Sequence, residues 1–206
     1  MISRLHYISQ EPHLPNIQEA CEAGCSWIQL RAKNLSDEAY LHLAEEAKCI
    51  TDRFGAKLII NDSLETALAI EAYGVHLGKK DMDLAEARKR VGDKMIIGGS
   101  TNSLEDILEA ATKGVDYLGL GPFRFTATKT DLNPVLGLEG MAAIMKEVKR
   151  LEIKVPIIAI GGIQSEDILV IREMGVHGVA VSAAITSAVD KKREVTLIQQ
   201  YVKGDK

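Results

Sequence analysis

Residues 22–33 read EAGCSWIQLRAK, and this stretch contains the pattern that decides the fold. A helical segment ends at Gly24, a short apolar strand follows at once, and polar side chains close the strand. Glycine just past a helix suits a left-handed cap, where any Cβ would be strained. The pattern recurs in RFGAKLIIND, AYGVHLG, VGDKMIIGGS, TKGVDYLGLG and MGVHGVAVS, so the helix-ending glycines are expected to be Gly24, Gly55, Gly74, Gly92, Gly114 and Gly175.

The repeat predicts eight strands, which read LHYIS, SWIQLRAK, KLIIND, GVHLG, MIIGGS, YLGLGPF, PIIAIGGI and GVAVS. Spread over 206 residues, each unit has about 26, enough for one strand, one helix and two short loops. Strands that alternate with helices pair in parallel through right-handed crossovers, and most of these strands are apolar throughout. The pattern therefore favours an α/β protein with a single (β/α)₈ TIM barrel over residues 1–206, rather than an open doubly wound sheet, which usually has fewer strands.

Composition and charge narrow the range of partners. The net charge of −4 and the sequence pI of about 5.8 argue against nucleic acid or an anionic membrane as a partner. The opening residues lack a signal-peptide pattern, and no apolar run approaches the roughly 18 residues of a membrane span. The three cysteines lack metal-type partners and are expected to be reduced thiols of the core: Cys21, Cys25 and Cys49. A cytoplasmic protein is expected.

Polar residues or glycines follow nearly all of the predicted strands, at the end where barrels carry their chemistry. Because side chains alternate along a strand, Gln29, Arg31 and Lys33 are expected to share one face, directed into the barrel mouth. The other strand ends contribute Asn61, Asp62, Asp81, Ser100, Thr126, Thr128, Lys129, Gly161, Gly162 and Ser182.

The residue types at these ends point to phosphate chemistry. Arg31, Lys33 and Lys129 would place three cations around one mouth, suited to charge-assisted hydrogen bonds with phosphate oxygens. Gly161-Gly162 and the segment around Ser182 follow the seventh and eighth strands, where barrels often bind phosphate. Each feature has an alternative explanation. The two cations of the second strand could be surface charges, and the two glycines could form only a tight turn.

Asp62 and Asp81 follow adjacent strands close to these cations. Two carboxylates, together with diphosphate oxygens and water, would suit Mg²⁺, which rarely takes an all-protein cage. Asp62 has a simpler alternative as a helix cap, since Asp62-Ser63-Leu64-Glu65 loosely fits a capping box. Asp81 does not, because Asp83 with Glu86 already offers a cap for its helix. His76 within GVHLG is expected in the core or behind a site residue, and no chemistry is assigned to it.

The ordered set of motifs resembles the thiamine phosphate synthase family from about Leu5 to Ile185. QLRAK, LIINDSLETALAIEAYGVHLGKKDM, IIGGST, YLGLGPFRFTATK, PIIAIGGI and GVAVSAAI carry the resemblance. It implies that hydroxymethylpyrimidine diphosphate is coupled with a thiazole or carboxythiazole phosphate, which gives thiamine phosphate and pyrophosphate. It also implies small phosphorylated molecules as partners and, because relatives often associate, a homo-oligomer.

The resemblance carries roles over to matching positions. Its pyrimidine diphosphate contacts match Gln29, Arg31, Lys33, Asn61, Ser100 and Lys129, of which Arg31, Ser100 and Lys129 would be catalytic. Its Mg²⁺ ligands match Asp62 and Asp81. Its thiazole phosphate contacts match Thr126, Thr128, Gly162, Val181 and Ser182.

The mechanism that the resemblance implies is dissociative. The C–O bond to pyrophosphate breaks first, which leaves a pyrimidine-methyl cation that the thiazole nitrogen attacks. Such a reaction calls for stabilisation of a leaving group rather than a nucleophile of the protein, so the missing Ser/His/Asp and Cys/His patterns are expected.

Four positions depart from the family pattern. Arg124 and Phe125 replace an aromatic residue and a proline of the GPxFPT motif, Asn102 stands where histidine is common, and Lys79 where glutamine is frequent. None is a residue with a proposed direct role.

Three other functions remain open. A thiazole tautomerase of similar fold would need an acid/base residue, and the histidine expected near the sixth strand is absent. A different phosphate-handling barrel would explain the glycines of the last two strands but not the two aspartates. A non-catalytic barrel that binds thiamine precursors would tolerate loss of a catalytic group.

Overall fold

A computed structural model describes residues 1–125 and 134–204 and contains a closed parallel barrel of strands β1 to β8 in chain order. Each strand pairs with the next, and β8 closes on β1, where Tyr7 lies opposite both Ile28 and Val181. The strands are β1 Leu5–Ile8, β2 Trp27–Leu30, β3 Lys57–Asn61, β4 Gly74–Leu77, β5 Ile96–Thr101, β6 Tyr117–Leu120, β7 Ile157–Ile160 and β8 Gly178–Val181. The predicted (β/α)₈ barrel is confirmed, and the open sheet is excluded.

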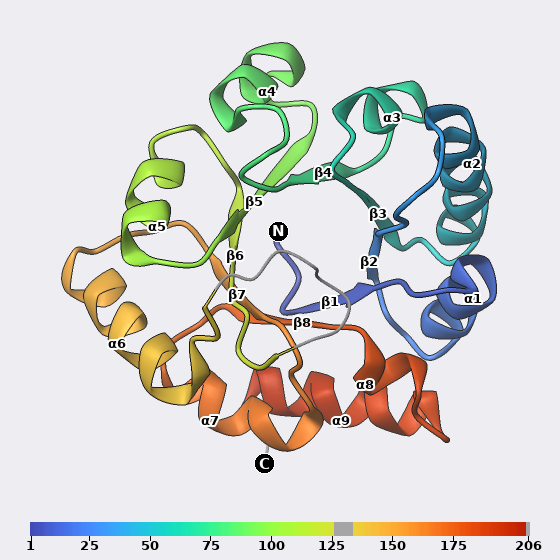
Figure 1. Cartoon of the computed structure of the whole chain (residues 1–206). Coiled ribbons are helices and arrows are strands. Elements are labelled where there is room, and N and C mark those ends of the chain that lie inside the picture. Colours follow the sequence, from blue (N-terminus) through green and yellow to red (C-terminus); the bar gives the residue numbers. More distant parts are fainter. Residues whose placement is uncertain (126–133, 205–206) are drawn as a thin grey trace.

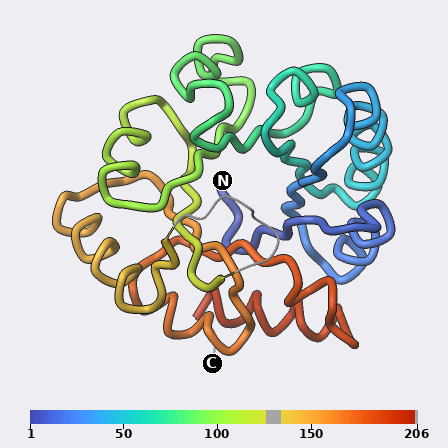
Figure 2. The backbone as a smooth tube through the Cα atoms, in the orientation of Figure 1, coloured from blue at the N-terminus to red at the C-terminus, as the bar shows by residue number. Residues whose placement is uncertain are grey.

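Helices form a ring around the barrel (Figure 1), and the chain passes around this ring in sequence order (Figure 2). They are α1 His13–Glu22, α2 Asp37–Arg53, α3 Leu64–Ala69, α4 Leu84–Val91, α5 Leu104–Ala111, α6 Gly137–Arg150, the 3₁₀ turn η1 Ser165–Asp167, α7 Ile168–Glu173, α8 Ala183–Thr186 and α9 Lys191–Lys203. Over the ranges that the structure describes, none of the helices combines the length and the apolar character needed to cross a membrane.

Side-chain alternation along the strands produces two cores. The larger one lies between the barrel and the helices and takes residues such as Val75 and Leu118. The smaller one fills the barrel itself and includes Trp27, Ile59 and Tyr117. Inward-facing positions therefore lead from an aromatic floor, at the amino ends of the strands, toward the polar residues at their carboxyl ends.

The floor of the barrel is tightly packed around His6. Its ring stacks on Trp27, with 4.6 Å between centroids, and meets Tyr117 edge-on. Its Nε2 lies 3.0 Å from the Ser3 carbonyl oxygen, and Ile2 packs against the same interior cluster. Burial lowers the pKa of His6 to about 3, so this imidazole is neutral at physiological pH.

Two details of the sequence-based prediction are wrong. Gly74 does not end a helix but begins β4, and a Cβ there would lie 2.7 Å from the Ile96 carbonyl oxygen, so close strand packing requires the glycine. Cys49 is exposed on α2, whereas Cys21 and Cys25 are buried free thiols as expected. The other five expected cap glycines all adopt positive φ.

Candidate active site

Gln29 and the two cations after it rise from the interior of the barrel toward its mouth. Strand β2 ends at Leu30, earlier than the predicted strand, so Arg31 and Lys33 lie on the irregular segment beyond it. Gln29 is 4% exposed inside the barrel, Arg31 is half-buried and Lys33 is exposed. The ammonium of Lys33 forms an ion pair with the Asp62 carboxylate. The structure thus brings together two residues that the sequence placed on neighbouring strand ends.

Asp62 follows β3 directly and adopts a left-handed backbone conformation, with φ 67°. The helix after it is capped by Ser63, whose Oγ accepts a hydrogen bond from the Thr66 N–H at 3.1 Å. The capping alternative for Asp62 is therefore excluded. A positive φ at a non-glycine residue costs about 1 kcal/mol and is concentrated at functional sites.

Asp81 lies beside Asp62 at the end of the neighbouring strand. Its Oδ2 accepts a hydrogen bond from the Gly78 N–H at 2.6 Å. Burial raises the pKa of the Asp81 carboxyl above its ordinary value, and the nearby Asp62 carboxyl raises it further. The cap of α4 is Asp83, as predicted, whose Oδ1 accepts from the N–H groups of Ala85 and Glu86 at 2.9 and 3.3 Å. Asp81 therefore has no capping task.

The pair of carboxylates is suited to Mg²⁺ only in partnership with a substrate. Residues 1–125 and 134–204 contain no group of three or more His, Cys, Asp or Glu side chains that could hold a metal ion. The proximity of Asp62 raises the pKa of Asp81, and a cation between the two carboxylates would reduce their repulsion. Mg²⁺ typically takes one or two carboxylates and completes its shell with water and phosphate oxygens, so the donor set fits this ion.

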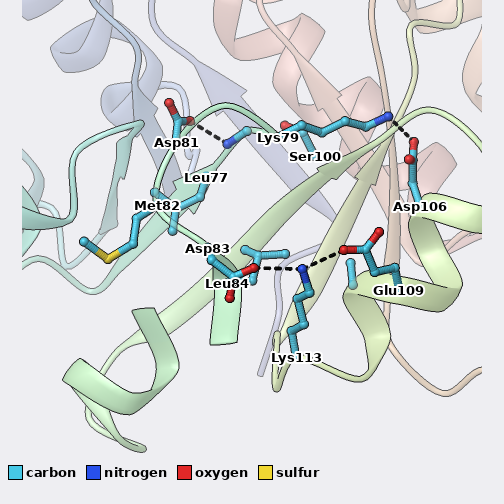
Figure 3. Close-up of a pocket in the computed structure, with 12 residues that line it drawn as sticks. Leu77, Lys79, Asp81, Met82, Asp83, Leu84, Ser100, Asp106, Glu109 and Lys113 are labelled. Carbon is cyan, nitrogen blue, oxygen red and sulfur yellow. Dashed lines mark hydrogen bonds and ion pairs between the residues drawn. The ribbon is translucent and has the colours of Figure 1, made fainter. Parts of the chain in front are cut away.

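Ser100 lies in the fifth strand next to a cavity of about 200 Å³. The cavity lies at the ends of β4 and β5, against α4 and α5, and Asp81 also lines it (Figure 3). Two ion pairs line this cavity. Lys79 pairs with Asp106, and Lys113 Nζ lies 2.8 Å from Asp83 Oδ2. Neither Lys33 nor Asn61 lines this space, so it is a side pocket of the barrel mouth.

The last two strands end in the expected glycines and serine. Gly161 and Gly162 have φ of 101° and 66°, and a Cβ on Gly161 would lie 2.6 Å from Pro122 Cα. Close packing of the loop after β6 is thus sufficient to require glycine here. The Ser182 hydroxyl donates to the Ile8 carbonyl at 2.6 Å. The Val181 side chain is buried among the outer-core residues, so only its backbone is available to a ligand.

Two residues that depart from the family pattern make hydrogen bonds around the described parts of the segment after β6, residues 121–125 and 134–136. Arg124 donates to both carboxylate oxygens of Asp167, with Nη2 at 2.6 Å from Oδ1. Asn102 Nδ2 donates to the Gly121 carbonyl at 2.7 Å and to the Pro134 carbonyl at 3.2 Å. Thr126, Thr128 and Lys129 of this loop lie outside the described residues.

His76 lies in a buried cluster behind Ser100, which confirms the position expected from the sequence, in the core or behind a site residue. His76 Nε2 lies 2.9 Å from Ser100 Oγ, and His76 Nδ1 lies 3.1 Å from the Tyr117 hydroxyl. Alternation within GVHLG accounts for the inward direction of His76, because Val75 and Leu77 pack outward. The contacts with Ser100 and Tyr117 were not predicted.

Fold and site together define a class of protein: a (β/α)₈ barrel enzyme with two cations, two carboxylates and a hydrogen-bonded serine at the carboxyl ends of its strands. The sequence model of a known family, described as Thiamine monophosphate synthase, matches residues 2–185, and the chain belongs to this family.

Relatives and solved structures agree with this assignment. A thiamine-phosphate synthase of Flavobacterium johnsoniae is 47% identical over 97% of this chain and 95% of its own. One from Bacteroides fragilis is 46% identical over 94% and 95%. A thiamine phosphate pyrophosphorylase from Pyrococcus furiosus superposes with a TM-score of 0.83 at 33% identity, over 98% of this chain and 96% of its own. A 3-hexulose-6-phosphate synthase, with a TM-score of 0.73 at 13% identity, shares the fold over 97% of this chain and 99% of its own.

Proposed function

We propose that this chain is a transferase that couples hydroxymethylpyrimidine diphosphate with a thiazole or carboxythiazole phosphate to give thiamine phosphate and pyrophosphate. The observation that carries the proposal is the meeting of Lys33, Asp62 and Asp81 at one point of the rim. Family membership supplies the reaction, and this cluster supplies groups suited to a metal-bound diphosphate. Residues 1–206 would act as one catalytic domain, and a homo-oligomer is the proposed assembly.

The pyrimidine diphosphate would bind across the ends of β2, β3 and β5. Arg31 and Lys33 offer N–H donors to its phosphate oxygens, and Asn61 and Ser100 offer polar side chains on the inner face of the barrel. Lys129 would add the third cation. Asp62 and Asp81 would hold Mg²⁺, which as a Lewis acid would neutralise the charge of the diphosphate.

Substrate binding has to rearrange the ion pair between Lys33 and Asp62. In the free protein each group neutralises the other at a partly exposed position, with 51% and 32% of the two side chains exposed. Such a pair contributes little stability, about 0 to 1 kcal/mol, so exchanging its partners requires little energy. The lysine is then available to the diphosphate and the aspartate to the cation. The ion pair therefore keeps both groups in position without blocking the site.

In the bond-breaking step, the C–O bond between the pyrimidine methylene and the diphosphate would break, and its electron pair would leave with the oxygen of pyrophosphate. The thiazole nitrogen would then donate its lone pair to the methylene carbon and form the new C–N bond. Arg31, Lys129 and Ser100 would stabilise the charge that develops on the leaving oxygen. The remaining task of the protein is to hold both substrates in line.

The thiazole phosphate would bind at the ends of β6, β7 and β8. The proposed contacts are Thr126, Thr128, Gly162, Val181 and Ser182. Because the Ser182 hydroxyl already donates to Ile8, and the Val181 side chain is buried away from the mouth, the donors of this last segment would be backbone N–H groups.

The decisive experiment is formation of thiamine phosphate by the purified protein, read as fluorescent thiochrome after oxidation. The reaction contains Mg²⁺, hydroxymethylpyrimidine diphosphate and either thiazole phosphate or carboxythiazole phosphate, with EDTA as the control. Metal-dependent product supports the proposal. Isomerisation of the carboxythiazole without coupling identifies a tautomerase, and binding without either reaction identifies a non-catalytic barrel.

A further inference from the structure

Buried side chains lead from the barrel interior to the Ser100 hydroxyl. His76 contacts Ser100 through Nε2 at 2.9 Å and the Tyr117 hydroxyl through Nδ1 at 3.1 Å. Because His76 is 6% exposed and Tyr117 is 1% exposed, water does not compete for the bond between them. Ser100 is half-buried and faces the side pocket.

The direction of each bond follows from donor and acceptor chemistry. Burial raises the pKa of Tyr117, so the phenol keeps its proton and can donate it to His76 Nδ1. With Nδ1 as the acceptor, the one proton of a neutral imidazole lies on Nε2 and points to the Ser100 oxygen.

The backbone at Gly98 makes room for this arrangement. Gly98 lies opposite His76 in the pairing of β4 with β5, and opposite Tyr117 in the pairing of β5 with β6. A Cβ at this position would lie 2.2 Å from Tyr117 Cζ and 2.6 Å from His76 Nδ1. Any side chain here would push the two rings apart. Glycine at this position thus permits the hydrogen bond that orients His76.

We propose that His76, held in its Nε2–H tautomer by Tyr117, is a positioning residue that directs the Ser100 O–H toward the leaving diphosphate. With its oxygen accepting from His76, the Ser100 hydroxyl turns its own proton to a group in the barrel mouth. A donor fixed before the substrate arrives needs no reorganisation as charge develops. The identity of the acceptor rests on the proposed coupling reaction, whereas the tautomer is a property of the free protein.

The tautomer is tested without any substrate. The full-length protein is labelled with ¹⁵N-histidine, and long-range ¹H–¹⁵N spectra are compared with those of His76→Gln to assign the His76 ring. The expected wild-type pattern has a proton on Nε2 and none on Nδ1, and Tyr117→Phe, which removes the donor, gives a mixture of both tautomers. A proton on Nδ1 in the wild type overturns the proposal, whether or not the protein makes thiamine phosphate.

Kinetics then separate positioning from mere packing. Ser100→Ala is expected to lower kcat by about 100-fold, and His76→Leu by about 10-fold, with little change in KM. His76→Gln keeps a side-chain N–H and recovers most of the lost rate. In the Ser100→Ala background His76→Leu adds no further loss, because the group that it positions is gone.

A second buried histidine provides the matched control. His6 also lies inside the barrel, but it bonds the Ser3 carbonyl rather than a residue of the rim. His6→Leu is expected to leave kcat within about twofold of wild type when thermal melting shows a folded protein. An equal loss of kcat in His6→Leu and His76→Leu, or a His76→Leu effect that is fully additive with Ser100→Ala, overturns the positioning role.

Discussion

The Asp62 carboxyl lies close enough to the Asp81 carboxyl to raise its pKa, although the two residues follow different strands. Burial of Asp81 opposes its ionisation, and the neighbouring Asp62 carboxyl adds to this cost. Lys33 offsets the charge on Asp62, and the Gly78 N–H offsets part of that on Asp81. Stability alone would not favour such a pair, whereas binding of a divalent cation would.

Removing the charge of Asp81 is expected to stabilise the metal-free protein. Because the folded-state pKa of Asp81 is raised above the ordinary 3.8, the folded state retains a proton that the unfolded chain releases. Stability is therefore lost as pH rises from 3.8 through the raised pKa. Asp81→Asn should raise the melting temperature at neutral pH by up to about 4 °C, and this gain should disappear below pH 3.8.

The measurement is thermal denaturation in EDTA, followed by circular dichroism over this pH range. Asp93→Asn, which neutralises an exposed aspartate of the α4–β5 connection, is the control and should leave the melting temperature unchanged at every pH. A destabilised Asp81→Asn variant at neutral pH would show that the carboxylate is needed for folding rather than for a cation.

Substitution of either aspartate is expected to make activity more dependent on Mg²⁺. Asp62→Asn and Asp81→Asn each remove one oxygen charge from the proposed metal site, so they should lower activity by about 10-fold or more at limiting Mg²⁺ and by less at saturation. Rates measured across a Mg²⁺ titration test this expectation. Identical losses at all Mg²⁺ concentrations would count against direct ligation.

The fold could be predicted because its determinants are local and repeated. In each unit the helix end, the apolar strand and the polar terminus lie within about ten residues, as the stretch around Gly24 shows. Closed parallel pairing then follows from the handedness rules for such connections. Gly74 misled the prediction because the sequence does not show that the Ile96 carbonyl passes so close to it.

The candidate site was only partly predictable for the same reason. Strand order places Asp62 and Asp81 at one rim, and their residue type suggests the metal. The partnership of Lys33 with Asp62, and the bond from His76 to Ser100, depend on the twist of the barrel and on the rotamers of side chains. Residue spacing indicates neither of these two contacts, so the sequence identified the residues or their neighbourhood but not the contacts between them.

Lys129→Ala is expected to slow breakage of the C–O bond while thiazole affinity stays largely intact. The proposed task of this cation is to stabilise charge on the leaving diphosphate, and removal of one such group typically costs about 100-fold in rate. Single-turnover measurements of pyrophosphate release report the chemical step, and titration with thiazole phosphate reports binding. Lost thiazole binding with normal chemistry would exclude this role.

Arg124 is expected to stabilise the protein through its paired hydrogen bonds with Asp167. Burial alone would raise the pKa of Asp167, but the bonds from Arg124 and from the Gln164 N–H outweigh burial and hold that pKa below its ordinary value. The stabilisation is therefore present above pH 3.8 and is lost as pH falls through the lowered pKa. Since Arg124 is half-exposed, Arg124→Ala should lower the free energy of unfolding by about 1 to 2 kcal/mol.

The same substitution should weaken binding of the thiazole phosphate. Arg124 Nη1 also donates to the Gly162 carbonyl at 3.2 Å, so its loss loosens the turn proposed to hold the phosphate, and KM for that substrate should rise several-fold with kcat nearly constant. Arg150→Ala removes an exposed pair with Glu147 on α6 and should change unfolding by less than about 0.5 kcal/mol. If both alanine variants unfold alike and leave KM unchanged, the contact with Asp167 is only a surface ion pair.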